Sequence, residues 1–380
     1  MKKRVMKAFG ALGSVVALSL LCLANVGGAA TASAASAPAA HPAPAVALGV
    51  PGSFRPAAAS FVSPAWGVVL GSASRAYRAQ LAVTADGGAH WSLMRTPDVR
   101  LANSGVGLPQ VNKVAFANRA DGWLYDQYNS RHMWVTHNGG KSWREVTLPG
   151  NVQAVAASAN AVYAVAGNHL YRSPLWRDVW RQASPGLRSG VMTGKTLAVS
   201  GHSVWFGSDT SLWTTADGAH WARYQVHSPG SYYGIPYELA GIAAASPRTV
   251  AFLWVAPIGM YRSGIKVLVS SNGGRSQRQT LTDPPPAGDA AAFAVSPGRL
   301  GMISVAVVTP GLDNIYSSAT QGRIWSTFRV PGTSGGAMLG SLEFVSPAVG
   351  SFVTGNPASS SGSQLLRTTD AGRTWHAVRF

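Results

Sequence analysis

The sequence has 380 residues, 46% of them hydrophobic and only 12% charged, so it can bury a sizeable core in one large domain or two ordinary ones. Its formal net charge is +17, and its single cysteine, Cys22, lies near the N-terminus. Beyond Cys22 the composition excludes disulfide bonds and thiolate metal sites, and its wealth of Gly, Trp, Ser, Thr and Val favours short strands and tight turns over helices.

Residues 1–34 have the features of a secretory signal peptide. A basic head precedes an apolar run over 8–24, and the small residues of "ATASAAS" (30–36) offer a cleavage site near Ala34. Two alternatives remain open at this point. The segment is then either a retained membrane anchor or the leader of a lipoprotein attached through Cys22, although Leu21 is larger than lipid attachment prefers.

An Ala/Pro-rich linker follows the predicted signal peptide over residues 35–50. Cleavage would remove four positive charges and no negative one, lowering the net charge from +17 to +13. A product this basic suits an anionic wall polymer or lipid head groups, whereas export argues against nucleic acid as a partner. The alternative is adaptation to an acidic medium, where few carboxylates favour folding at low pH. We expect a secreted or cell-surface protein with no membrane span after cleavage.

A short segment recurs along the remaining chain with the pattern Ser/Thr-x-Asp-x-Gly-x-x-Trp. Two copies match it fully and five in part: "TADGGAHW" (84–91), "TTDAGRTW" (368–375), "THNGGKSW" (136–143), "TADGAHW" (215–221), "SPLWRDVW" (173–180), "SSNGGRSQ" (270–277) and "SATQGRIW" (318–325). We call these seven segments the box turns. They close at intervals of 37 to 56 residues, near the period of roughly 40–50 residues that indicates propeller blades.

Strand-like runs recur with the same period as the box turns. A "VSP" or "ASP" motif precedes four of them, and runs such as "WGVVLG" (66–71) and "TVAFLWV" (249–255) follow these motifs. A further run such as "RAQLAVT" (78–84) enters each turn, and another such as "HWSLMR" (90–95) leaves it. Four strands in each of seven units predict an all-β fold over residues 51–380: a seven-bladed β-propeller of four-stranded antiparallel blades.

The residue types of the box turn have structural explanations. The Asp or Asn accepts hydrogen bonds from its own turn, the glycine supplies a positive φ, and the tryptophan packs into the seam beside the next blade. We therefore expect a structural role for the residues at these positions. They are Asp86, Gly88, Trp91, Asn138, Gly140, Trp143, Asp217, Trp221, Asn272, Gly274, Trp325, Asp370, Gly372 and Trp375.

These turns resemble the Asp-box, or BNR, repeat, which occurs in sialidases, some glucan hydrolases, sortilin-type receptors and photosystem II assembly-factor-like propellers. The sequence pattern "GW…T-x-D-G-G-x-x-W" is most similar to that of the last group, whose bacterial relatives are often exported. The resemblance covers about residues 57–380. It implies that the box is structural and lies away from the face that engages a ligand.

Candidate binding residues lie on the opposite face, which we call the loop face because it carries the second-to-third-strand loops and the connections between blades. Tyrosine and arginine there are the types that anchor interfaces and stack on sugars or peptides. The set comprises Arg75, Tyr77, Asp126, Tyr128, Arg131, Tyr232, Tyr233, Tyr261 and Arg262. We expect a non-catalytic scaffold that binds a protein or a cell-surface glycan.

The alternative is a glycoside hydrolase of sialidase or glucanase type. A two-carboxylate mechanism has Asp126, Glu238, Asp313 and Glu343 as candidates, but no spacing pairs them. The resemblance to sialidases would also require three arginines, and "SFRPA" (53–57) matches the family's first arginine motif only weakly. No catalytic residue is therefore assigned. We expect no cofactor and no metal, because the nine histidines are scattered. How the ring closes stays open.

Overall fold

The structure is a computed structural model. It describes residues 49–73, 78–102, 109–183, 197–208, 210–259, 262–280, 288–298, 302–309, 312–331, 341–355 and 362–380. The predicted signal peptide and nearly all of the linker lie outside these residues, so both remain predictions. Among the described residues, no helix is long and apolar enough to cross a membrane.

Seven four-stranded antiparallel sheets make up the described chain, one after another along the sequence. Blade 1 has β1 (Arg55–Phe61), β2 (Gly67–Ser72), β3 (Gln80–Thr84) and β4 (Ser92–Met94); blade 2 has β7 (Lys113–Phe116), β8 (Gly122–Tyr125), β9 (His132–Thr136) and β10 (Arg144–Thr147); blade 3 has β11 (Val152–Ala157), β12 (Ala161–Ala166), β13 (His169–Pro174) and β14 (Arg181–Gln182).

The other four sheets repeat this plan. Blade 4 has β15 (Leu197–Ser200), β16 (Ser203–Gly207), β17 (Ser211–Thr215) and β18 (Ala222–Gln225); blade 5 has β21 (Glu238–Ala244), β22 (Val250–Gly259), β23 (Arg262–Ser270) and β24 (Arg278–Gln279); blade 6 has β25 (Asp289–Val295), β26 (Ile303–Thr309), β27 (Leu312–Ser318) and β28 (Ser326–Arg329); blade 7 has β29 (Ser341–Phe344), β30 (Gly350–Gly355), β31 (Ser363–Thr368) and β32 (His376–Ala377).

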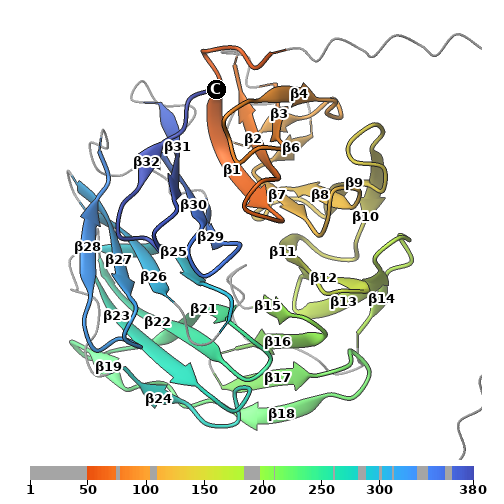
Figure 1. Cartoon of the computed structure of the whole chain (residues 1–380). Coiled ribbons are helices and arrows are strands. Elements are labelled where there is room, and N and C mark those ends of the chain that lie inside the picture. The colour runs from red at the N-terminus through yellow and green to blue at the C-terminus, as the bar shows by residue number, and fades with distance from the viewer. Residues whose placement is uncertain are drawn as a thin grey trace, which may run out of the picture. The chain divides into compact units, whose positions relative to one another are not determined.

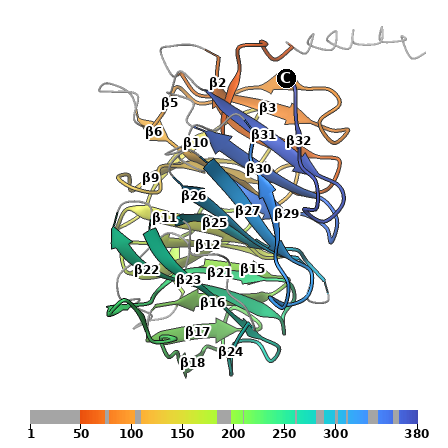
Figure 2. The same ribbon diagram turned by 90° about the vertical axis from the view of Figure 1, so that its left-hand side faces the viewer.

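The sheets are arranged around a central axis, with the first strand of each blade, such as β1, β11 and β15, nearest the centre (Figure 1). The predicted seven-bladed β-propeller is confirmed. Two short ladders are added to the blades: β5 (Arg100–Leu101) pairs in parallel with β6 (Gln110–Val111), and β19 (Ser231–Tyr232) pairs with β20 (Ile235–Pro236). Seen from the side, β5, β6 and the long β22–β23 hairpin extend toward the same side, which is the loop face (Figure 2).

The core is divided among the seams between blades. Within the described residues, each pair of neighbouring blades encloses its own cluster of buried apolar side chains. The second strands supply much of each cluster, because both of their faces are covered; β2, β12 and β30 are buried along their whole length. A blade cannot bury both faces alone, so the closed ring is the stable unit.

The ring closes by side-chain packing between blades 7 and 1. Each blade is one continuous stretch of chain, and the sheets of these two blades share no strand. The C-terminal Phe380 places its ring centroid 4.7 Å from that of Phe54 and 4.9 Å from that of Trp91. Residue Gly49 forms an antiparallel bridge with Ser92 of β4, so the last linker residues add to the outer edge of blade 1.

Polar groups also link these two blades. The Phe61 N–H donates to Glu343 Oε1 (2.8 Å), and the Ala59 N–H donates to Ser341 Oγ (3.1 Å). From β31, Arg367 donates to the carbonyl oxygens of Gly87 (2.6 Å) and Pro64 (2.9 Å). The closing seam therefore combines an aromatic cluster with hydrogen bonds between β1 and β29.

Candidate functional site

The box turns form compact hydrogen-bonded units between the third and fourth strands. In the first of them Thr84 Oγ1 accepts the Gly88 N–H (2.8 Å) and donates to Asp86 Oδ1 (2.9 Å). Asp86 Oδ1 also accepts the His90 N–H (3.0 Å). Glycine is needed at position 88 because φ there is +95°. The turn is thus held together by hydrogen bonds among its own residues.

The same hydrogen bonds recur in the turns at 136–143, 215–221, 270–277 and 368–375. Their hydroxyl-to-amide distances are 2.9 Å for Thr136 to Gly140, 2.9 Å for Thr215 to Gly218, 2.8 Å for Ser270 to Gly274 and 2.8 Å for Thr368 to Gly372. The turn at 318–325 uses Thr320 in place of the Asp. In the turn at 173–180 Ser173 Oγ accepts the Val179 N–H instead (3.0 Å).

These hydrogen bonds hold the turn carboxylates in their charged form. Bonds from the backbone and side chain of His90 lower the pKa of Asp86, and those from His220 lower the pKa of Asp217. Partial burial opposes the effect at Asp370, where bonds from Thr374 nevertheless lower the pKa to about 2. The carboxylates of these turns therefore serve as hydrogen-bond acceptors within their own turns.

Tryptophans that close the turns pack into the seams. Trp91, Trp143, Trp180, Trp221, Trp325 and Trp375 each contact the cluster between their own blade and the preceding one. Blade 5 has Gln277 at this position. The seam between blades 4 and 5 holds two other buried tryptophans, Trp205 of β16 and Trp254 of β22. Trp205 is 1% exposed and donates its indole N–H to the Gly273 carbonyl (2.9 Å).

The predicted binding residues of blade 2 surround the β8–β9 loop. Asp126 is buried there, where its Oδ1 accepts the Asn112 side-chain amide (3.0 Å) and the Tyr128 N–H (3.1 Å). Burial raises the pKa of Asp126, and the Tyr128 N–H opposes that effect. Asp126 thus orders the loop, while the Tyr128 and Arg131 side chains are exposed.

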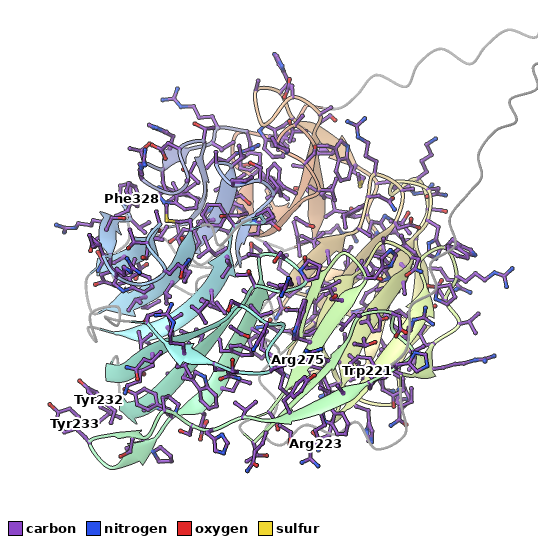
Figure 3. The ribbon with its side chains drawn as sticks, turned by 60° about the horizontal axis from the view of Figure 1, so that its bottom comes forward. Trp221, Arg223, Tyr232, Tyr233, Arg275 and Phe328 are labelled. Carbon is purple, nitrogen blue, oxygen red and sulfur yellow. The ribbon has the colours of Figure 1, made fainter. Side chains whose placement is uncertain are left out.

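The predicted tyrosines of blade 5 lie on the β19–β20 hairpin. The ring of Tyr232 covers β23, since a Cβ on Gly264 would lie 2.6 Å from Tyr232 Cγ. Tyr233 meets Tyr232 edge-on at 4.7 Å, is 83% exposed and has a φ of +50°. Figure 3 shows the two tyrosines together on this hairpin, apart from Arg275.

The structure does not bring the predicted binding residues into one site. Loop β8–β9 and hairpin β19–β20 lie on opposite sides of the ring (Figure 1). Arg75, Tyr77 and Tyr261 fall outside the described residues, and Arg262 is described only as the first residue of β23. The loop-face set therefore stays a prediction.

The carboxylates suited to glycosidase chemistry are also dispersed. Asp126 follows β8 in blade 2, Glu238 begins β21 in blade 5, Asp313 lies in β27 of blade 6, and Glu343 lies in β29 of blade 7. Burial raises the pKa of Glu343 to about 7, against the Phe61 N–H and the Ser351 hydroxyl, which both donate to its Oε1. Among the described residues, no cluster of three or more His, Cys, Asp or Glu could hold a metal.

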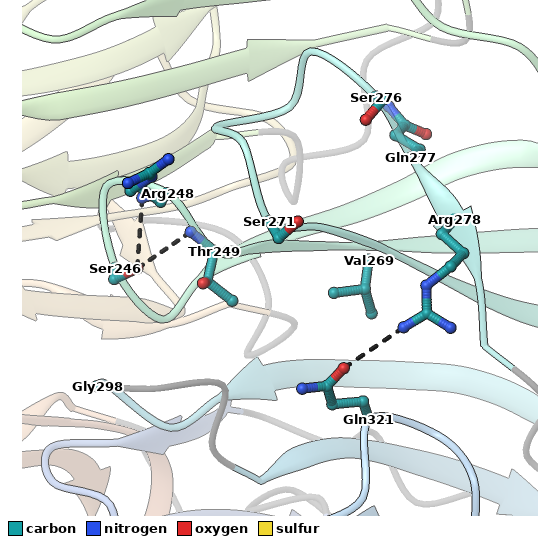
Figure 4. A pocket seen from close by; sticks show the side chains of 10 residues that line it. All are labelled: Ser246, Arg248, Thr249, Val269, Ser271, Ser276, Gln277, Arg278, Gly298 and Gln321. Carbon is teal, nitrogen blue, oxygen red and sulfur yellow. Dashed lines mark hydrogen bonds between the residues drawn. The ribbon is translucent and has the colours of Figure 1, made fainter.

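A cavity of about 660 Å³ lies on the face that carries the box turns, which we call the turn face. It runs between blades 5 and 6, and Figure 4 shows the ten residues that line it. Its polar lining includes Ser246, Arg248, Thr249, Ser271, Arg278 and Gln321. Arg278 Nη2 donates to Gln321 Oε1 across the opening (3.4 Å), so its guanidinium is positioned over the cavity.

A second cavity of about 340 Å³ lies between blades 4 and 5 on the same face. Its lining includes Trp205, Tyr224, Asn272 and Arg275, and it shares Arg248 with the first cavity. We call the two cavities together the blade-5 groove, because both adjoin the box turn whose tryptophan is replaced by Gln277. Volumes of roughly 300–1,000 Å³ are usual for small-ligand sites.

The chemistry of the blade-5 groove is cationic and hydroxylated. Its lining residues include three arginines and no Asp or Glu. Sequence reasoning missed this site because it searched the loop face, yet a signal was present. A basic residue follows the second glycine position in four box turns, as Lys141, Arg275, Arg323 and Arg373, and all four are exposed.

The sheet order and the seam clusters define the class of this protein as a seven-bladed β-propeller, here with a basic groove on its turn face. Among solved structures, one of YCF48 bound to a D1 peptide is 18% identical, covers 85% of this chain and 96% of that chain, and has a TM-score of 0.55. No protein-family model matches the sequence, and comparison with the curated proteins gives no significant match.

Two further structures are similar. The GH74 xyloglucanase of Xanthomonas campestris is 15% identical with a TM-score of 0.54; the match covers 88% of this chain and 55% of the xyloglucanase, so this chain spans about half of that enzyme's length. Hsv2 of Kluyveromyces lactis is 10% identical with a TM-score of 0.51, over 86% of this chain and 98% of that one. At these identities the similarity shows the shared fold alone.

Proposed function

We propose that this protein is an exported, non-catalytic β-propeller that serves as a binding or assembly scaffold for a protein or a cell-surface glycan. One observation carries the proposal. The two cavities of the turn face are lined mainly by arginine, hydroxyl and amide groups, with Trp205 and Tyr224 in the smaller one, whereas the four candidate carboxylates lie on four different blades and line neither cavity. Such a lining suits recognition and offers no acid or base for cleavage.

The positions of the carboxylates support this reading. A glycosidase needs two carboxyl groups flanking one bond, roughly 5–9.5 Å apart. Asp126 is occupied with its own loop, and Glu343 accepts a backbone N–H across the closing seam. The inner strands also favour a scaffold, since β1, β11, β21 and β25 are rich in alanine, and among the described inner strands β1 alone carries an arginine, Arg55.

The similar structures are compatible with either kind of partner. One similar protein, YCF48, was solved with a D1 peptide, and another is a xyloglucanase. The hydrogen-bonded box turns support our assignment of the repeats to the Asp-box, or BNR, type. Export rests on residues 1–34, whose basic head and apolar run are typical of a signal peptide.

A glycoside hydrolase of sialidase or glucanase type is the second candidate. The observation that favours it is the pKa of Glu343, which burial raises to about 7 and which would suit a general acid. The purified full chain, incubated with fluorogenic sialosides and xyloglucan oligosaccharides, should release no product while binding on a glycan or peptide array. Product release that Glu343→Gln abolishes would overturn the scaffold proposal.

A further inference from the structure

The blade-5 groove concentrates positive charge that comes from three separate segments. Arg248 lies in the β21–β22 turn, Arg275 in the box turn and Arg278 at the start of β24. Across the described part of the chain, the ion pairs engage none of these three guanidinium groups. Since an arginine presents a planar fork of N–H donors, each can grip a carboxylate or phosphate oxygen pair.

The backbone that carries these arginines is held in place. The Ser246 hydroxyl accepts the N–H groups of Arg248 (3.3 Å) and Thr249 (3.1 Å). The Arg248 carbonyl accepts the Gly273 N–H (2.8 Å), and the Gly273 carbonyl accepts the indole N–H of Trp205 (2.9 Å). These bonds tie the β21–β22 turn, the box turn and blade 4 together, so little ordering is required when a ligand binds.

The neutral side chains of the groove indicate the kind of backbone to which the ligand's charged groups are attached. Ser246, Thr249, Ser271 and Ser276 offer hydroxyls, and Gln277 and Gln321 offer amides. Such groups exchange hydrogen bonds with a hydroxylated chain. In the larger cavity Val269 is the one apolar side chain of the lining. The larger cavity therefore lacks the apolar pockets that anchor peptide side chains, while the smaller cavity adds the aromatic side chains of Trp205 and Tyr224 to the lining.

We propose that the blade-5 groove binds an extended hydroxylated polymer with repeated negative charge, with the arginines holding the negative groups and the hydroxyl and amide side chains holding the hydroxyl groups between them. This inference rests on the proposed function and names the ligand class of that scaffold. The shared chemistry is a hydroxylated chain with repeated negative charge. Its source is either a polyuronic acid, which supplies carboxylates, or a polyol phosphate, which supplies phosphodiesters.

The test measures binding of the full chain to labelled oligogalacturonate and to labelled polyglycerol phosphate, with cello-oligosaccharide as the neutral reference. The double variant Arg248→Gln/Arg275→Gln removes two charges from the groove. Its matched control is Arg119→Gln/Arg373→Gln, since Arg119 lies in the equivalent first turn of blade 2 and Arg373 in the equivalent box-turn position of blade 7, both exposed.

We expect the groove variant to weaken binding at least about tenfold, because a charged hydrogen bond is worth roughly 1.5–3 kcal/mol and about 1.4 kcal/mol is a factor of ten. The control should change binding less than about twofold, and added salt should weaken binding of the wild type. The polymer that binds more tightly identifies the anionic group.

Three results would overturn the inference: equal losses in both variants, equal affinity for the neutral reference, or no binding of either anionic polymer. Each leaves the scaffold proposal standing if the chain still binds a peptide or another glycan on the array. Product release from any oligosaccharide would instead overturn the proposed function while the arginine dependence of binding could remain.

Discussion

Two seams between blades carry arginines on the turn face, but the surroundings of those arginines differ. Between blades 2 and 3, Arg144 donates to Asp178, and His137 lies with Nδ1 2.7 Å from Asp121 and Nε2 3.3 Å from Asp178. Between blades 4 and 5, Arg248 and Arg275 line an open cavity whose lining has no carboxylate. One seam thus pairs its arginine with a carboxylate, and the other leaves its arginines lining an open cavity.

The closing residue differs between the same two seams. Trp180 ends the box turn of blade 3 and packs into its seam, whereas Gln277 ends that of blade 5. The blade-5 turn nevertheless keeps the hydrogen bond found in the other box turns, since the Gly274 N–H donates to Ser270 Oγ (2.8 Å). The comparison teaches that the hydrogen-bonded turn and the tryptophan that packs into the seam are separable features of a blade.

The largest effect is expected from Trp205→Ala, which removes one of the two tryptophans buried in the blade 4–5 seam. Because the side chain is 1% exposed and bonds to Gly273, the free energy of unfolding should fall by about 3–5 kcal/mol. Denaturant unfolding measures the change. Gln277→Ala is the control and should change stability by less than about 0.5 kcal/mol; equal costs for the two variants would contradict our account of what fills this seam.

Asp178→Asn tests the seam between blades 2 and 3. The substitution keeps the shape but removes the charge that Arg144 and His137 share. Because Arg144 is itself exposed to water, we expect a loss of about 2 kcal/mol in the free energy of unfolding. The reference is Asp98→Asn, whose exposed pair with Arg78 should contribute less than about 1 kcal/mol. A cost for Asp178→Asn no larger than this reference would show that the seam does not depend on its ion pairs.

The closing seam of blades 7 and 1 extends the comparison to an acid held by hydrogen-bond donors. Burial raises the pKa of Glu343 from 4.5 to about 7. Its contribution to stability is therefore fully present below pH 4.5 and is lost as the pH rises through about 7. Glu343→Gln should match the wild type at pH 5 and be more stable at pH 8 by on the order of 1–2 kcal/mol. Parallel loss of stability in both proteins would refute this assignment.

Much of the fold could be predicted because its signals are local. Thr84, Asp86 and Gly88 bond to one another within five residues, so their spacing in the sequence already specifies the turn. Even the box turn of blade 3, which matches the pattern poorly, has Ser173 and Trp180 at the first and last positions of the pattern. Ring closure could not be predicted in this way, since the contact of Phe54 with Phe380 joins the two ends of the propeller and no local pattern encodes it.

The candidate site was harder to predict for the same reason. Arg248 and Arg275 belong to different turns, and they line one cavity only because the Gly273 N–H joins the second turn to the first. Of the two predicted tyrosines of hairpin β19–β20, Tyr233 is exposed, whereas Tyr232 packs over Gly264. Residue type alone does not separate a binding side chain from one that packs on its neighbour.

Because blades 7 and 1 share no strand, the order of the blades along the chain can be permuted without dividing a sheet. In the described residues every blade keeps its four strands on one uninterrupted stretch, and Phe380 ends beside Phe54. A circular permutant that joins these ends by a short linker and begins at another blade would break no sheet. Whole blades are likewise the natural pieces by which such a gene could be lengthened, shortened or shuffled.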